Sequence, residues 1–383
     1  MLPISNSLMD AALAGRVWRP GVGPSLVTLR GNDVVDITSS VHPTMRDLCE
    51  APNPAQIVRQ AEGETIVTLQ DLSNASLNAK AQDDLRWLAP CDLQAIKACG
   101  VTFAGSMVER VIEEQAAGDP ARAEAIRARV GTIIGDSLSG LTPGSKEAEK
   151  VKELLQSEGL WSQYLEVGIG PYAEVFTKSQ PMSAVGWGAD VGLHPVSEWN
   201  NPEPEIVLVV GSDGTIKGAT LGNDVNLRDI EGRSALLLGK AKDNNASCAL
   251  GPLIRFFDDG YGIDDLRRAE LSMSVTGEDG FELQGHSSMT QISRDPEDLA
   301  AQTIGRHHQY PDGFVLFCGT MFAPTKDRDG PGLGFTHHTG DVVEISEAAL
   351  GSLRNTVRLS TDCAEWTFGT AALMRNLAKR GLL

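Results

Sequence analysis

The sequence lacks the cysteine patterns of a disulfide framework or a thiol metal site. Its six cysteines are scattered over 383 residues with no CxxC pair, and such thiols are typical of a reducing compartment. The N-terminus shows no basic start followed by a long apolar core, and no stretch reaches the length needed to span a membrane. The sequence therefore predicts a soluble, cytoplasmic protein with reduced thiols.

Basic residues are also scarce. The chain has 33 Lys and Arg against 51 Asp and Glu, which gives a formal net charge of -18. Non-specific binding to nucleic acid or to an anionic membrane needs clustered Lys and Arg, because the attraction to phosphate supplies most of its free energy. We therefore expect a small-molecule partner, with neither nucleic acid nor membrane among the partners.

The composition is that of a globular protein, with 41% hydrophobic and 22% charged residues. Residues 1–92 read as a small β-rich N-terminal domain, with two short strands in 25–39 and another in 64–72. Residues 93–383 read as a large, mostly antiparallel β domain, so the expected fold class is α+β, mainly β. Further strands are expected at 206–210, 215–222, 266–275, 281–288, 313–319 and 340–346.

Helical patterns interrupt the β domain in two places. A helical insert is expected at about 108–165, where Ser145 can cap the start of a helix and Gly159 its end. A last helix is expected at about 362–380, with Asp362 as its N-terminal cap.

Two acids, Glu203 and Glu205, stand before a run of five apolar residues at 206–210. The run is rich in β-branched residues and too short for an ordinary helix, so it predicts a buried strand. Side chains alternate along a strand, which places both carboxylates on one face, about 6 to 7 Å apart. Because a carboxylate is rarely buried without a partner, either the two acids are solvated or a cation lies between them.

A third acid, Asp224, follows a short hairpin-like connection and the pair Gly222-Asn223. A strand returning beside the first would bring Asp224 close to Glu203 and Glu205. Three carboxylates without nearby His or Cys suit Mg²⁺ or Mn²⁺ better than Zn²⁺. Octahedral coordination would leave three positions for a bidentate small molecule and one water. Solvated loop acids are the alternative, because short motifs have a high false-positive rate.

Four motifs appear in the order found in one enzyme family. They are Glu203-x-Glu205, Asn223-Asp224-Val225 with Arg228-Asp229, Lys242 six residues before Cys248, and GFVLFCGT at 313–320 followed by GDVVEIS at 340–346. Over about residues 97–350 the chain resembles the fumarylacetoacetate hydrolase family. The resemblance implies a mixed β-sandwich roll with a helical insert, and a homodimer or homotetramer.

The resemblance also implies roles for individual residues. Glu203, Glu205 and Asp224 would bind a divalent metal, Mg²⁺ or Mn²⁺. Lys242 would be the active-site lysine, and Thr320 and Arg228 would lie near the substrate. Other readings stay open at this stage: Lys242 can pair with a metal-binding carboxylate, Arg228 with Asp229 or a surface acid, and Thr320 can be a turn residue.

One departure from the family pattern is informative. The hydrolases open their catalytic domain with G-x-N-Y-x-x-H-A-x-E, in which the His acts as base, but here Ser106 stands at the position of the His and Glu109 matches the Glu. A serine cannot replace imidazole as a proton acceptor near neutral pH. This opening, the stretch SEWNNPEPE at 197–205 and Ser247-Cys248-Ala249 after Lys242 resemble the sugar-acid dehydratase branch.

The resemblance to this branch implies a lyase that dehydrates a 2-keto-3-deoxy-D-pentonate (xylonate or arabinonate) to 2,5-dioxopentanoate in pentose catabolism. Lys242, or Glu109 through a water, would move the C3 proton, and Ser106 would bind the departing hydroxyl or that water. One alternative is a hydrolase or decarboxylase that cleaves a C–C bond of another 2-keto acid. A catalytically silent binding or scaffold protein is a further alternative.

Overall fold

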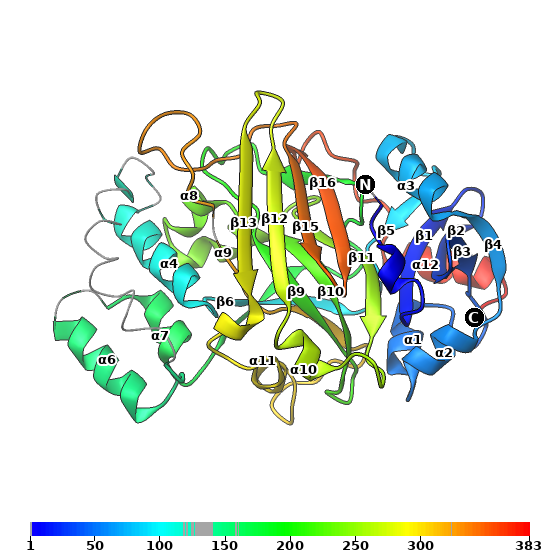
Figure 1. Cartoon of the computed structure of the whole chain (residues 1–383), viewed down its shortest axis with the longest axis horizontal. Coiled ribbons are helices and arrows are strands. Elements are labelled where there is room, and N and C mark those ends of the chain that lie inside the picture. Colours follow the sequence, from blue (N-terminus) through cyan, green and yellow to red (C-terminus); the bar gives the residue numbers. More distant parts are fainter. Residues whose placement is uncertain are drawn as a thin grey trace.

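The computed structural model describes residues 2–117, 119, 122–123, 126, 141–157, 159, 161–322 and 324–383. Figure 1 shows the strands of two sheets in the middle of the molecule, the N-terminal elements at one end and helices α4, α6 and α7 at the other. Both sheets contain antiparallel and parallel pairs. The predicted α+β class is confirmed, with two mixed sheets.

The larger sheet has eleven strands and runs through both halves of the chain. In spatial order its strands are β4 (Glu64–Thr68), β3 (Asp33–Asp36), β2 (Gly23–Arg30), β1 (Leu13–Arg19), β11 (Cys248–Phe256), β10 (Ile216–Asp224), β9 (Pro204–Val210), β14 (Phe314–Phe317), β6 (Ala95–Gly100) and β7 (Glu174–Ser179), while β5 (Arg86–Leu88) pairs with β1. Strand β1 pairs with β11, with Leu13 opposite Arg255, so the N-terminal strands continue the sheet that carries the acids. The division into domains at residue 92 stays a prediction.

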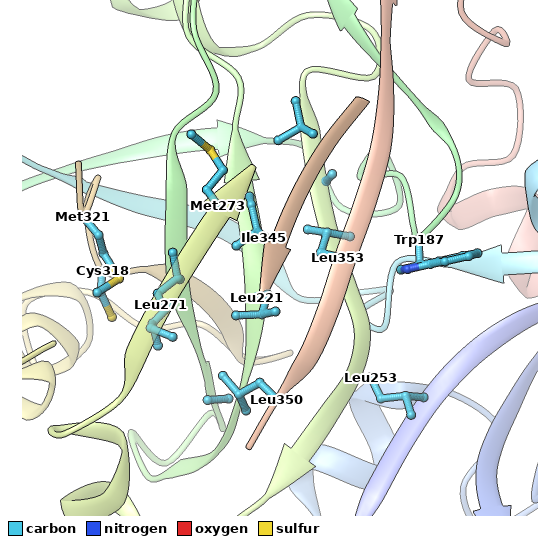
Figure 2. Packing of buried hydrophobic residues seen from close by; sticks show 14 of the residues in the cluster. Trp187, Leu221, Leu253, Leu271, Met273, Cys318, Met321, Ile345, Leu350 and Leu353 are labelled. Carbon is cyan, nitrogen blue, oxygen red and sulfur yellow. The ribbon is translucent and has the colours of Figure 1, made fainter. Parts of the chain in front are cut away.

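The smaller sheet has five strands and packs against the larger one. Its order is β13 (Glu282–Ser288), β12 (Glu270–Thr276), β15 (Val342–Glu347), β16 (Gly351–Leu359) and β8 (Asp190–Leu193). Buried and more exposed residues alternate along β12, as expected for a strand with one face on the core. Figure 2 shows Leu271 and Met273 of β12 near Leu221 of β10 and Leu353 of β16.

Helices cover the ends of the two sheets. They are α1 (Met45–Glu50), α2 (Pro54–Gln60), α3 (Leu69–Asn78), α4 (Ala104–Ala116), α6 (Lys146–Ser157), α7 (Gln163–Ile169), α8 (Arg228–Glu231), α9 (Leu238–Lys242), α10 (Ile263–Leu266), α11 (Pro296–Thr303) and α12 (Thr370–Lys379). Within the described residues, no helix is both long and apolar enough to cross a membrane.

The strands predicted from the sequence are present, with shifted ends. The predicted strand at 64–72 stops at Thr68, because the Thr68 side chain accepts the Asp71 amide proton and caps α3. The expected cap at Ser145 is confirmed, since Ser145 Oγ accepts the amide proton of Ala148 at 3.1 Å. Much of the insert predicted at 108–165, including residues 127–140, lies outside the described residues.

The prediction that Asp362 starts the last helix is wrong. Helix α12 begins at Thr370, after Gly369. The residues before it make tertiary contacts instead: the Phe368 ring packs edge-on against Trp18, with ring centroids 4.9 Å apart. The helix itself lies beside the N-terminal strands (Figure 1), where Asn376 Nδ2 donates to the Val22 carbonyl at 2.7 Å.

Candidate metal centre

The pairing of β9 with β10 brings the three predicted acids together. Glu205 lies opposite Gly222 in the antiparallel register, and the Asp224 amide donates to the Glu203 carbonyl at 3.0 Å. One carboxylate oxygen from each of the three acids lies within 4.8 Å of the others. Each residue is only 1% exposed, so the predicted convergence is confirmed and the alternative of solvated loop acids is wrong.

Two buried lysines contact this carboxylate group. Lys242, at the end of α9, places Nζ 2.5 Å from Glu203 Oε2 and 3.1 Å from Asp224 Oδ2. Lys178, on β7, places Nζ 2.7 Å from Asp224 Oδ1. Lys240 points elsewhere, because its Nζ lies 3.3 Å from His194 Nε2 in an exposed contact. The predicted Lys242 therefore reaches two of the three acids, whereas the sequence analysis missed Lys178.

Arg110 and Glu231 extend the charged network, and the sequence analysis assigned no role to either. Arg110, one residue after Glu109 on α4, forms ion pairs with Glu203 and with Glu231 Oε2, the latter at 2.7 Å. Glu231 Oε2 is also 4.0 Å from Lys242 Nζ. Both residues are buried. One feature of the sequence could have identified Arg110: it is a charged residue directly after Glu109, which belongs to a family motif.

Strand β7 lines the site, although the sequence analysis did not predict it. Glu174 and Phe176 are two residues apart and so share a face of the strand, and the Phe176 ring lies 5.7 Å from Lys242 Nζ. The Glu174 carboxyl packs over Gly100, where an added Cβ would lie 1.9 Å from Oε2. Burial, reinforced by the negative charge of Glu231, raises the pKa of Glu174 to about 7.

The acids of the centre differ in their partners. Burial would raise the pKa of Glu203, but Lys242 and Arg110 outweigh that effect and lower the pKa. Burial together with the charges of Asp224 and Glu203 raises the pKa of Glu205 well above its usual range. Glu205 instead accepts hydrogen bonds from uncharged groups. The donors are the Gly319 amide at 2.6 Å and the Thr320 hydroxyl at 3.4 Å.

This donor set fits a hard divalent cation. The centre offers three buried carboxylates, and within the described part of the chain no ion pair reaches Glu205. A divalent cation would supply the positive charge that Glu205 lacks, and carboxylate oxygens are the ligands that Mg²⁺ and Mn²⁺ prefer.

The remaining predicted site residues have partners of their own. Arg228 Nη2 is 3.1 Å from Glu109 Oε2, and its guanidinium lies 4.5 Å from the centre of the Trp199 ring. Arg228 thus pairs with Glu109 and not with Asp229. Ser106 lies near the start of α4, where its hydroxyl donates to the Phe103 carbonyl at 2.8 Å. The structure therefore brings Glu109 together with Arg228, and Thr320 together with Glu205.

Gly319 is held in a backbone conformation that suits only glycine. Its φ is +104°, and an added Cβ would lie 2.0 Å from Thr102 Oγ1. We expect Gly319→Ala to lower the free energy of unfolding by about 2 kcal/mol or more, because both strain and a clash are introduced. Chemical denaturation measures this change. Gly105→Ala is the control, since its Cβ meets nothing within 4 Å, and equal stability of the two variants would contradict the prediction.

Two mixed sheets, with three buried carboxylates at the ends of β9 and β10 and two buried lysines beside them, define an α+β protein with an oxygen-ligand centre. The chain belongs to the fumarylacetoacetate hydrolase family. Residues 166–358 match the family model described as "Fumarylacetoacetate (FAA) hydrolase C-terminal", and this stretch contains the three acids, both buried lysines and Thr320.

Two curated relatives carry dehydratase names. The chain is 27% identical over 292 residues to a "Probable 2-keto-3-deoxyxylonate dehydratase" of Haloferax volcanii, covering 76% of this chain and 92% of that protein. It is 31% identical over 185 residues to the "2-dehydro-3-deoxy-D-arabinonate dehydratase" of Saccharolobus solfataricus, covering 48% of this chain and 58% of that protein.

A solved structure shares the fold. It is described as "2-keto-3-deoxy-D-arabinonate dehydratase complexed with magnesium and 2,5-dioxopentanoate". Its TM-score is 0.60 at 20% identity, and the match covers 91% of this chain and 99% of that one. The predicted fumarylacetoacetate hydrolase-like fold is thereby confirmed.

Proposed function

We propose that this protein is a metal-dependent dehydratase that converts a 2-keto-3-deoxy-D-pentonate to 2,5-dioxopentanoate in pentose catabolism. The observation that carries the proposal is the buried set of Glu203, Glu205 and Asp224 with Lys242 in contact with two of them. The dehydratase names of two relatives support the choice of reaction within the family. The small-molecule partner would be the 2-keto acid, and assembly as a homodimer or homotetramer stays a prediction.

Glu203, Glu205 and Asp224 would hold Mg²⁺, or Mn²⁺ in its place. When bound, such an ion polarises the C2 carbonyl of a 2-keto acid and so makes the C3 protons more acidic. Thr320 contacts one of the proposed ligands, and Arg228 is held between Glu109 and Trp199. We assign both Thr320 and Arg228 to substrate binding.

Glu174 is the side chain best suited to accept the C3 proton. Its pKa of about 7 makes the carboxylate available near neutral pH while keeping it basic. Burial would lower the pKa of Lys242, but the carboxylates of Asp224, Glu203 and Glu231 outweigh it and raise the pKa well above its usual value. Lys242 is therefore an ammonium ion, which can stabilise negative charge that develops on the substrate oxygens.

The proposed chemistry balances as a loss of water. The C3–H bond breaks, its electron pair forms the new double bond, and the C4 hydroxyl leaves with a proton as water. Further proton shifts turn C5 into an aldehyde. Glu109 through a water remains the alternative group for moving the C3 proton, and Ser106 remains the candidate for binding the departing hydroxyl or that water, since both lie on α4 with Arg110.

The test uses metal-stripped protein with 2-keto-3-deoxy-D-xylonate or 2-keto-3-deoxy-D-arabinonate, with and without added Mg²⁺. Formation of 2,5-dioxopentanoate is followed by coupled oxidation of its aldehyde. We expect turnover that depends on Mg²⁺. If the protein binds Mg²⁺ and yet dehydrates neither substrate, the proposal fails, and cleavage of a C–C bond in another 2-keto acid becomes the function to test.

A further inference from the structure

Lys178 is a fully buried cation whose ammonium group contacts one carboxylate oxygen and two carbonyl oxygens. The residue is 0% exposed. Its Nζ lies 2.7 Å from Asp224 Oδ1, 2.6 Å from the Lys242 carbonyl oxygen and 3.2 Å from the Val225 carbonyl oxygen. An ammonium group has three protons; two are donated to the carbonyl oxygens, and the contact with Asp224 Oδ1 is an ion pair.

The three acceptors come from the two elements that carry the centre. Asp224 ends β10 and Val225 follows it, whereas the Lys242 carbonyl lies at the C-terminal end of α9. Lys178 itself belongs to β7, at the edge of the larger sheet. One side chain thus connects a proposed metal ligand with the main chain of the proposed active-site lysine.

The backbone of β7 is irregular where Lys178 leaves the strand. Ile96 of β6 pairs with Ser179 and Lys97 pairs with Thr177, so Lys178 is the extra residue of a bulge. Bulges change the direction of a side chain and are frequent beside active sites. Here the bulge accompanies a lysine that points into the centre.

We propose that Lys178 is a positioning residue, which fixes the Asp224 carboxylate and the end of α9 so that the Lys242 ammonium stays on Glu203 and Asp224. The contacts of Lys178 with two carbonyl oxygens indicate a positioning role in addition to charge neutralisation, because a cation that only neutralised Asp224 would not need them. The activity part of the test rests on the proposed function, whereas the metal-binding part does not.

The test compares Lys178→Met and Lys178→Arg with the unaltered protein and with Lys97→Met. Lys97 is the matched control, since it lies on the paired strand β6 and its Nζ donates to Thr177 at 3.0 Å in an exposed contact. Mn²⁺ affinity is measured by calorimetry. The kcat and KM are measured with the 2-keto-3-deoxy pentonate as substrate, and folding is checked by circular dichroism.

We expect Lys178→Met to weaken Mn²⁺ binding by about 10- to 100-fold, the usual effect of removing a group that orients a ligand. We also expect kcat to fall at least tenfold, with little change in KM. Lys178→Arg should fail to restore either quantity, because a planar guanidinium cannot reproduce the three contacts arranged around a compact ammonium. Lys97→Met should match the unaltered protein.

Full Mn²⁺ affinity and kcat in Lys178→Arg would overturn the proposal, because charge alone would then suffice. Unchanged values in Lys178→Met would overturn it as well. If Lys178→Met does not fold, Lys178→Ala is refolded in the presence of propylammonium, which replaces the missing part of the side chain. Mn²⁺ binding should then rise with the propylammonium concentration. Folding without restored Mn²⁺ binding would count against the proposal. Mn²⁺ binding without turnover in the unaltered protein would refute the proposed function only.

Discussion

The Glu205→Gln protein should lose at least about 10³-fold in kcat/KM, because a bound metal ion supplies several kcal/mol of transition-state stabilisation and each 1.4 kcal/mol is worth about tenfold. Glutamine keeps the size of the side chain and an oxygen that can accept from the Gly319 amide. It removes the charge that a divalent cation would need. Mg²⁺ affinity measured by calorimetry should fall together with activity.

The same substitution should leave the metal-free fold intact or make it more stable. Burial and the charges of Asp224 and Glu203 raise the pKa of Glu205 well above its usual range, so ionised Glu205 costs free energy in the metal-free protein. A neutral amide avoids that cost. Thermal unfolding in the presence of a chelator should therefore give a Tm no lower than that of the unaltered protein.

Glu347→Gln is the matched control for this prediction. Glu347 is also a buried acid whose pKa is raised by burial, and it accepts the Ala349 amide proton at 2.6 Å. It belongs to β15 of the smaller sheet, outside the candidate centre. Its substitution should leave Mg²⁺ affinity and activity unchanged. Retained Mg²⁺ affinity in Glu205→Gln would show that Glu205 is not a ligand.

The carboxylate group could be predicted because its determinants are local. A β-branched run after Glu203-x-Glu205 specified the strand and its face, and the connection before Asp224 is short enough for β9 and β10 to pair directly. The spacing of six residues to Cys248 then pointed to Lys242 as the active-site lysine. These signals lie within about forty residues of sequence, where the strand period and short turns restrict the possible geometries.

The other half of the site comes from segments distant in sequence. Glu174 and Lys178 reach the centre because β7 pairs with β6, a contact across the helical insert that strand periodicity cannot reveal. Arg110 comes from α4, and its role depends on how that helix packs. The raised pKa of Glu174 likewise arises from burial and from Glu231, which the sequence does not place beside it.

Tertiary contacts also decided the boundaries that were wrong. Asp362 has the residue type of a helix cap, but the following segment packs Phe368 onto Trp18, and α12 starts only after it. In the N-terminal region, Thr68 changes the chain from strand to helix within a single predicted strand. Intrinsic preference is a weak guide wherever packing offers a larger gain in free energy.

Glu174→Gln should flatten the dependence of stability on pH between about 4.5 and 7. The folded state raises the pKa of Glu174 from 4.5 to about 7, so it binds this proton more tightly than the unfolded chain does. Stability contributed by the protonated carboxyl is present below pH 4.5 and is lost as the pH rises through 7, by about 3 kcal/mol. Denaturation at pH 5 and pH 8 measures the difference, which should shrink in the variant.

The activity of Glu174→Gln should fall at least about 10²-fold at pH 8, the usual cost of removing a general base. In the unaltered protein, kcat/KM should fall tenfold per pH unit once Glu174 is protonated, because only the carboxylate accepts the C3 proton. Asp190→Asn is the control, since burial also raises the pKa of Asp190, on β8 of the other sheet. As the pH rises and Glu174 loses its proton, activity should thus increase while stability decreases. Full activity in Glu174→Gln with the same pH profile would exclude Glu174 as the base.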